Sequence, residues 1–143
     1  MKIIVPPIKC QGIKTKLVPW ILENASLNAG GRWIEPFLGS GVVGFNAKAK
    51  FAIFNDLNPH IVAFYQSLKT GDITPNKIKS HLTAEGALLA SYGQDYYYEV
   101  RKRFNKDKNP LDFVFLSRAC FNGVMRFNKK GHFNVPFCKK PGR

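Results

Sequence analysis

The spacing of apolar residues predicts alternating helices and strands in residues 1–57. A helix is expected where apolar side chains recur at helical spacing before glycines, and a strand where apolar and polar positions alternate. The expected elements are a helix at 14–27 closed by Asn28 and Gly30-Gly31, a strand at 32–37, the start of a helix at 42–49 and a strand at 50–58. This order is that of the opening units of a doubly wound α/β sheet.

Residues 58–124 are predicted to be helical, and a different element follows them. Helix starts are indicated where an Asn or Thr that can cap a helix precedes a proline. The expected elements are helices starting at Asn58-Pro59, Thr74-Pro75 and Asn109-Pro110, a separate helix over 95–105, and a β-hairpin over 126–137 around a Lys-Lys-Gly turn. Tyr97, Val100 and Phe104 fall on one side of the 95–105 helix.

The number of predicted strands limits the fold class. Only two convincing strands precede the helices, whereas a doubly wound sheet needs more. Either the helical block is an insertion and further strands lie beyond residue 143, or the fold is not doubly wound.

The charge of the chain narrows the class of partner. In 143 residues, 22 Lys and Arg stand against 9 Asp and Glu, which gives a net charge of +13. Such a balance favours nucleic acid, and a membrane surface is the competing partner. No apolar run is long enough to cross a bilayer, so no membrane segment is expected.

The cysteines and histidines are not arranged like metal ligands. Cys10, Cys120 and Cys138 are far apart and odd in number, which indicates a reducing, cytoplasmic location without disulfides or a cysteine zinc site. The three histidines stand apart and are expected at the surface or in packing. We expect no metal site.

The segment "WIEPFLGSGVVGF" contains a glycine pattern that needs a ligand or a tight turn. Gly39, Gly41 and Gly44 match the G-x-G-x-x-G fingerprint of dinucleotide-binding loops, and Asp56 follows Gly39 by 17 residues. Glu35 and its neighbouring proline fit a dinucleotide strand poorly. S-adenosylmethionine is the better ligand, because Glu35 suits its amine and Asp56 suits its ribose hydroxyls. A strand-to-helix turn without a ligand is the alternative.

Five segments in this order resemble the Dam-type DNA adenine methyltransferases. They are "PPIKCQGIKTKL", "IEPFLGSGVVGF", "NDLNPHIVAFY", "YYYEVRKRFN" and "FNGVMRFNKKGHFNVPF". The resemblance covers nearly the whole chain. It implies an α/β, Rossmann-like methyltransferase fold, incomplete in this chain, with a mainly helical target-recognition domain ending in a β-hairpin. The implied domains are 1–57 for the cofactor, 58–137 for DNA, and 138–143 as the start of a return to the catalytic domain.

The resemblance also implies binding residues. The cofactor S-adenosylmethionine would contact Cys10, Lys14, Glu35, Phe37, Gly39, Gly41 and Asp56. The family usually has an aromatic residue in place of Cys10 and a glycine in place of Ile13.

Double-stranded DNA would be contacted mainly by the last segment. Positions matching Phe121, Asn122, Val124, Arg126 and Pro136 lie at or near the bases, Asn128 can bond a base edge, and Lys129, Lys130, Lys139 and Lys140 would contact phosphates. The target word GATC follows from the resemblance only.

The catalytic motif of the family is not found in residues 1–143. The family uses Asp-Pro-Pro-Tyr to accept hydrogen bonds from the adenine amino group and to stack the flipped base. The sequence contains no such quartet, and no catalytic residue is assigned. We therefore expect a truncated or split enzyme, inactive alone, that needs a downstream segment or second chain. A non-catalytic DNA-binding module is the alternative, and a nicotinamide oxidoreductase is disfavoured by the charge.

Overall fold

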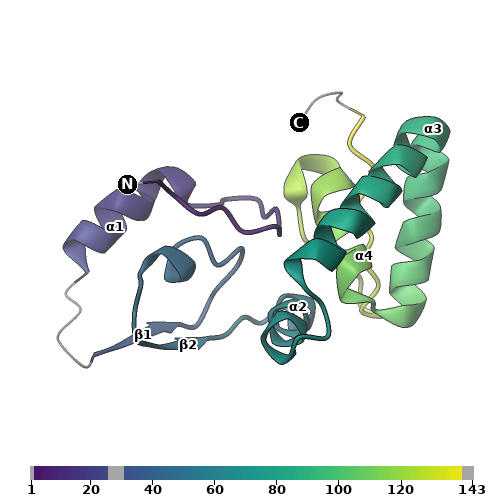
Figure 1. Ribbon diagram of the computed structural model, residues 1–143. Helices are drawn as coiled ribbons and strands as arrows, with labels where there is room; N and C mark the ends of the chain where they lie inside the picture. The colour runs from purple at the N-terminus through teal and green to yellow at the C-terminus, as the bar shows by residue number, and fades with distance from the viewer. Residues whose placement is uncertain (1, 26–30, 140–143) are drawn as a thin grey trace.

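The computed structural model describes residues 2–25 and 31–139, and its helices and strands fall into two neighbouring parts (Figure 1). The elements are a 3-10 turn at Thr15–Leu17, α1 (Val18–Asn24), β1 (Arg32–Glu35), a 3-10 turn at Gly44–Asn46, β2 (Phe51–Phe54), α2 (Pro59–Thr70), α3 (Pro75–Asp107), α4 (Pro110–Ala119) and a 3-10 turn at Phe121–Gly123. The helix expected over 14–27 is shorter in the structure: α1 ends at Asn24, and Ala25 is already extended with a φ of −91° and a ψ of 111°. Asn28 and Gly30 lie outside the described residues, as do residues 140–143.

The first part is built on a small parallel sheet. β1 pairs with β2 in parallel, so that Ile34 is opposite Ile53, and these are the strands of the sheet within the described residues. Apolar residues from the N-terminal segment, α1 and the glycine loop form a separate small core with Trp33. Its other members are Ile3, Val18, Ile21, Leu22, Val42 and Val43. By contrast, Ile34 is 61% exposed and Ile53 is 51% exposed.

The expected helix at 42–49 is wrong. This segment forms only the 3-10 turn at Gly44–Asn46, and Lys48 then adopts a left-handed φ of 51° that leads into β2. The Asn46 side chain donates to Val42 O (2.7 Å) and to Ile4 O (2.8 Å). These bonds tie the short connection to the N-terminal segment, which leaves no length for a helix.

The predicted starts of the three long helices are confirmed. Asn58, Thr74 and Asn109 each accept a backbone N–H in the first helical turn. Each helix has proline in its first turn, where the missing N–H leaves no bond unmade. α2 ends at Gly71, whose φ of 83° is the left-handed conformation that glycine adopts without strain.

The two helices expected between residues 75 and 105 are joined in α3. The helix turns sharply at Gly93, whose φ of 62° and ψ of −141° are not helical, and the two halves fold back on each other (Figure 1). Tyr97, Val100 and Phe104 in the second half are fully buried, as expected from their spacing.

The main core is formed by the helices and is joined to the first part. It contains Ile8 and Leu38 from the first part together with aromatic and aliphatic residues of α2, α3 and α4. The N-terminal segment lies against α4, where Lys9 N donates to Ser117 Oγ (3.3 Å) and Arg118 donates to Pro7 O (3.1 Å). The glycine loop and the helices are therefore held together by packing and by hydrogen bonds.

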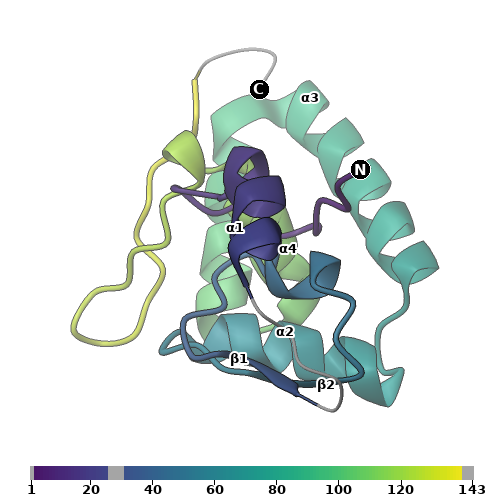
Figure 2. The same cartoon turned by 90° about the vertical axis from the view of Figure 1, so that its left-hand side faces the viewer.

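Residues 124–137 form a long antiparallel loop beside the helices (Figure 2). Isolated bridges pair Phe127 with Phe133 and Cys120 with Phe137, whereas the described residues contain no regular strands in this segment. The expected hairpin is therefore only a loop with hairpin-like pairing. Cross-loop backbone bonds join Asn128 N to His132 O (2.9 Å) and Asn134 N to Arg126 O (3.1 Å), and the Asn105 side chain of α3 also bonds the Phe133 backbone.

None of the helices in the described ranges is both long enough and apolar enough to cross a membrane.

Candidate functional site

The glycine loop lies at the carboxyl ends of β1 and β2. Asp56, just after β2, accepts the Gly39 N–H at Oδ2 (2.7 Å) and the Asn58 N–H at Oδ1 (2.9 Å). The Leu38 N–H also donates to Asn55 O (2.8 Å). Asp56 therefore holds the loop against the end of β2. Each carboxylate oxygen has a second lone pair, so these bonds leave room for a ligand hydroxyl.

Two of the glycines in the loop are required by close contacts. Gly41 has a φ of 78°, and a Cβ there would collide with the Phe45 ring. A Cβ on Gly44 would collide with Glu35 and Phe54. Gly39 differs: its φ is 56°, but nothing lies within 4 Å of the place of a Cβ. The side of the loop at Gly39 is thus open, which a flat ligand lying against backbone requires.

Glu35 ends β1 next to this loop. Burial raises the pKa of its carboxyl group, while hydrogen bonds from Trp33 and the Gly44 backbone lower it in part. The Trp33 Nε1–H donates to Glu35 Oε2 (3.3 Å). A half-buried carboxyl of this kind would bind a cationic ligand group, because a nearby positive charge favours its charged form.

Two exposed apolar side chains flank Asp56 and the loop. Phe37 is 76% exposed, and Leu57, which directly follows Asp56, is 84% exposed. Phe37 is among the residues expected at the cofactor from the sequence, whereas Leu57 is not. The exposure of so large an apolar side chain beside the Asp56 carboxylate is what distinguishes Leu57, and only the structure supplies it.

Of the two residues expected in the N-terminal motif, one packs inward and the other faces solvent. Cys10 Sγ lies 3.8 Å from Met125 Sδ, and burial together with Asp56 raises the pKa of its thiol to about 11. Lys14 is exposed, and its Nζ donates to Gly12 O (2.9 Å). Asn58 Nδ2 also lies 3.7 Å from Met125 Sδ. Met125 thus places the 124–137 loop beside the N-terminal motif and the start of α2.

The residues expected at DNA are mainly exposed on and beside the 124–137 loop. The exposed members are Phe121, Asn122, Arg126, Asn128, Lys129, Lys130, Pro136 and Lys139, and Val124 is half-buried; Lys140 lies outside the described residues. Arg126 donates from Nε to Asn134 Oδ1 (2.8 Å) and from Nη2 to Asn134 O (3.1 Å). Asn128 Oδ1 accepts the N–H groups of Lys130 and His132, which shapes the turn.

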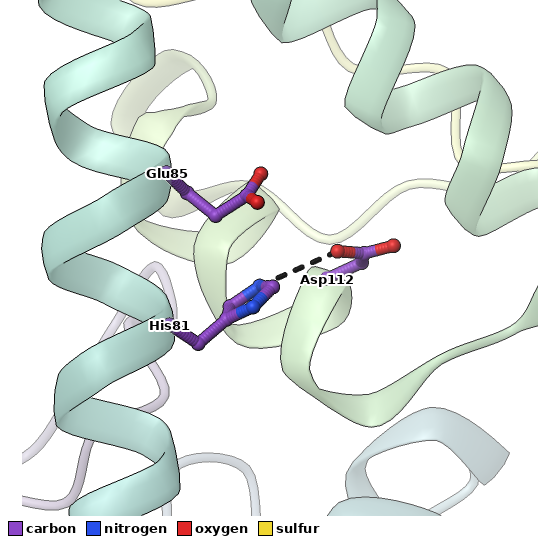
Figure 3. A group of neighbouring side chains, drawn as sticks. All are labelled: His81, Glu85 and Asp112. Atoms are coloured by element: carbon purple, nitrogen blue, oxygen red, sulfur yellow. Dashed lines mark ion pairs between the residues drawn. The ribbon is translucent and has the colours of Figure 1, made fainter.

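A cluster of ionisable side chains lies away from the glycine loop, between α3 and α4 (Figure 3). His81, Glu85 and Asp112 bring one ligand atom each within 4.8 Å of one another, which is a spacing suited to a metal ion. However, Arg103 already donates to Asp112 (2.8 and 2.6 Å) and to Glu85 (3.0 Å). Arg103 thus supplies the positive charge that these carboxylates need. Sequence spacing does not reveal this cluster, because Asp112 is on another helix.

Comparison with known proteins identifies the family. A family model described as D12 class N6 adenine-specific DNA methyltransferase matches residues 11–143. The chain belongs to this family. The matched residues include the glycine loop, Asp56 and the 124–137 loop. Both groups of expected binding residues therefore lie within the part of the chain that matches the D12-class family.

Individual relatives of this D12-class chain are named as a type II methyltransferase or as DNA adenine methylases. It is 35% identical to the type II methyltransferase M.MjaIII of Methanocaldococcus jannaschii, over 92% of this chain and 51% of the relative. It is 35% identical to the DNA adenine methylase of Vibrio cholerae, over 94% of this chain and 48% of the relative. The DNA adenine methylase of Haemophilus influenzae is 34% identical over 92% of this chain. The chain spans about half the length of these curated relatives.

Proposed function

We propose that the chain is the cofactor-binding and DNA-binding portion of an enzyme that methylates the exocyclic amino group of adenine in duplex DNA. The observation that carries the proposal is the open glycine loop at the carboxyl ends of two parallel strands, with a carboxylate at each strand end. Ligands of α/β sheets bind at this edge. The family membership supplies the class of reaction.

S-adenosylmethionine is the proposed methyl donor, and it supplies an electrophilic methyl group when bound. Glu35 fits the donor's amine, because a half-buried carboxyl gains from a cation. Asp56 fits the ribose hydroxyls with the lone pairs that its backbone bonds leave free. Open backbone at Gly39 would lie against the donor, with Cys10, Lys14, Phe37 and Gly41 at its border.

The 124–137 loop is proposed to bind duplex DNA. Arg126 is held at its Nε and Nη2 by Asn134, which aims the guanidinium without packing it away from solvent. Arginine and asparagine read base edges, whereas Lys129, Lys130 and Lys139 suit phosphates. In this proposal residues 1–57 serve the cofactor, residues 58–137 serve DNA, and the chain works in the cytoplasm.

A further segment is proposed to complete the enzyme. Residues 1–143 contain no Asp-Pro-Pro-Tyr, and the relatives are about twice as long as the matched region. A downstream segment or a second chain would supply this motif. A DNA-binding module that keeps part of a cofactor fold is the alternative, and it differs from the enzyme only in turnover.

The test of cofactor binding is Gly39→Ala. A Cβ at position 39 would have no atom within 4 Å, so the variant should still fold. The added methyl group would, however, occupy the surface proposed to contact the cofactor. Isothermal titration with S-adenosylmethionine should show weak binding by the parent and at least a tenfold loss in the variant.

Gly71→Ala is the matched control for Gly39→Ala. Gly71 also has a positive φ, at 83°, and open space around a Cβ, so the substitution imposes a similar strain far from the loop. It should leave the affinity unchanged. Equal affinities for the parent and both variants would remove the glycine loop from the cofactor site.

A further inference from the structure

An open hollow lies between the second half of α3 and the 124–137 loop. Its volume is about 380 Å³, and it is lined by Tyr98, Arg101, Lys102, Asn105, Lys106 and His132. Five of these residues share one face of α3, since they recur at helical spacing, and His132 comes from the loop. The lining contains no carboxylate among the described residues, so the hollow carries positive charge.

The hollow has a rigid frame. Asn105 pairs with both backbone groups of Phe133, donating from Nδ2 to O (3.0 Å) and accepting the N–H at Oδ1 (2.7 Å). Lys108 Nζ also donates to Gly131 O (3.1 Å). The loop that carries Lys129 and Lys130 is therefore fixed to the same face of α3 as the hollow.

The three consecutive cations of α3 have different partners. Arg103 is bonded to the carboxylates of Glu85 and Asp112. Arg101 lies over the Tyr98 ring at 4.6 Å and donates to Val135 O (3.2 Å), so it helps to hold the loop.

The two lysines of the hollow are available for an external anion. Lys102 and Lys106 are exposed one helical turn apart, and within residues 2–25 and 31–139 neither forms an ion pair. Their ammonium groups are strongly hydrated point charges, which suit phosphate oxygens.

We infer that this hollow holds the sugar-phosphate backbone of the duplex beside the sequence that the 124–137 loop contacts. Lys102 and Lys106 neutralise two phosphates there, independently of sequence, and Arg101 and Asn105 keep the loop in register with them. This inference rests on the proposed DNA-binding function and adds a second contact surface to it. Hydrogen bonds from Asn105 and Lys108 hold the 124–137 loop beside this face of α3. A duplex bound by the loop would therefore also lie against the hollow.

The experiment compares salt dependence of DNA binding in the full 143-residue chain. Affinities of the parent and of Lys102→Gln/Lys106→Gln are measured by fluorescence anisotropy on labelled duplexes, over about 50–200 mM salt. The slope of log K against log salt should shrink by about 1.8, since each lost phosphate contact removes about 0.9. The loss of affinity should be equal for all duplex sequences.

The matched control is Lys69→Gln/Lys79→Gln. It removes the same charge from exposed lysines of α2 and of the first half of α3, away from the hollow. It should change the slope by clearly less than one unit. On a duplex shortened to the contacted word, the parent and the hollow variant should bind alike.

The outcomes separate the two proposals. A parent that does not bind duplex DNA would overturn the proposed function and this inference with it. A parent that binds, with the hollow variant indistinguishable from the control, would overturn the inference alone. A hollow variant that loses affinity for only one sequence would also overturn it, because phosphate contacts carry no sequence information.

Discussion

At the scale of single residues, Arg103 joins three helical segments. It comes from the second half of α3 and bonds to Glu85 of the first half and to Asp112 of α4. Pairing with Asp112 raises the pKa of Arg103 above its usual range. The Tyr96 hydroxyl also donates to Glu85 Oε2 (2.9 Å). The network thus fixes the fold-back of α3 against α4.

We predict that Arg103→Met destabilises the chain by about 3 kcal/mol, measured by urea denaturation. Removing one partner leaves the buried Asp112 carboxylate without its cation, which typically costs about 3–5 kcal/mol. We expect the low end of this range because only one partner is buried: the Asp112 side chain is 2% exposed, whereas that of Arg103 is 43% exposed.

The control for Arg103→Met is Lys102→Met, which changes an exposed neighbour by the same charge. It should alter stability by no more than about 0.5 kcal/mol. Equal stability of both variants would mean that the network contributes nothing to the fold.

At the scale of elements, α3 depends on a single glycine for its shape. Gly93 adopts a φ of 62° and a ψ of −141°, close to a region that only glycine populates readily. The position is open, so a Cβ there would meet no atom within 4 Å. The fold-back therefore depends on backbone freedom and not on space.

Two glycine-to-alanine substitutions in α3 should have opposite signs. Gly93→Ala should destabilise the chain by about 1–3 kcal/mol through backbone strain. Gly86→Ala should stabilise it by about 0.4–1 kcal/mol, since Gly86 lies in regular helix with open space around a Cβ.

Thermal and urea denaturation of the two variants check this pair. Because both add the same methyl group in open space, surface hydrophobicity is matched. Destabilisation of similar size in both would show that the turn at Gly93 tolerates an ordinary residue.

At the scale of the whole molecule, the sheet exposes apolar surface that a further segment can cover. Ile34 and Ile53 are register partners on neighbouring strands and lie side by side, both more than half exposed. Phe51, at the start of β2, is 53% exposed. Exposed apolar patches of this kind favour association.

We predict that residues 1–143 alone transfer no methyl group to DNA, and that a segment from the unmatched half of a relative restores transfer when it is added or fused. The reason is that these residues contain no Asp-Pro-Pro-Tyr and leave the sheet uncovered. The measurement is incorporation of labelled methyl into DNA.

A variant with Ile34→Lys and Ile53→Lys separates docking from DNA binding. It should keep the DNA affinity of the parent and lose at least tenfold in reconstituted transfer. Robust transfer by the 143-residue chain alone would contradict the prediction. It would then assign the catalytic role to Asn134, Pro136 and Phe137, whose amide, proline and aromatic ring are the nearest mimic of Asp-Pro-Pro-Tyr in these residues.

The sequence by itself determined the features that local chemistry controls. A capping residue followed by proline specifies a helix start from within four residues, and for this reason Pro59, Pro75 and Pro110 were predicted correctly. The glycine loop and Asp56 were found because their spacing reflects one strand-loop unit. The strong positive charge pointed to nucleic acid without any knowledge of structure.

Only the tertiary structure decided the features that depend on distant residues. Asn46 bonds to Ile4, so residues 42–49 form a turn where their local pattern favours a helix. The backbone of the 124–137 loop is anchored at Phe133 by the side chain of Asn105 on α3. His81, Glu85 and Asp112 meet across two helices, and Arg101 and Arg103 find partners elsewhere in the fold, whereas Lys102 between them stays exposed. Each of these outcomes is set by contacts between residues far apart in the chain, and the spacing of neighbours carries no information about them.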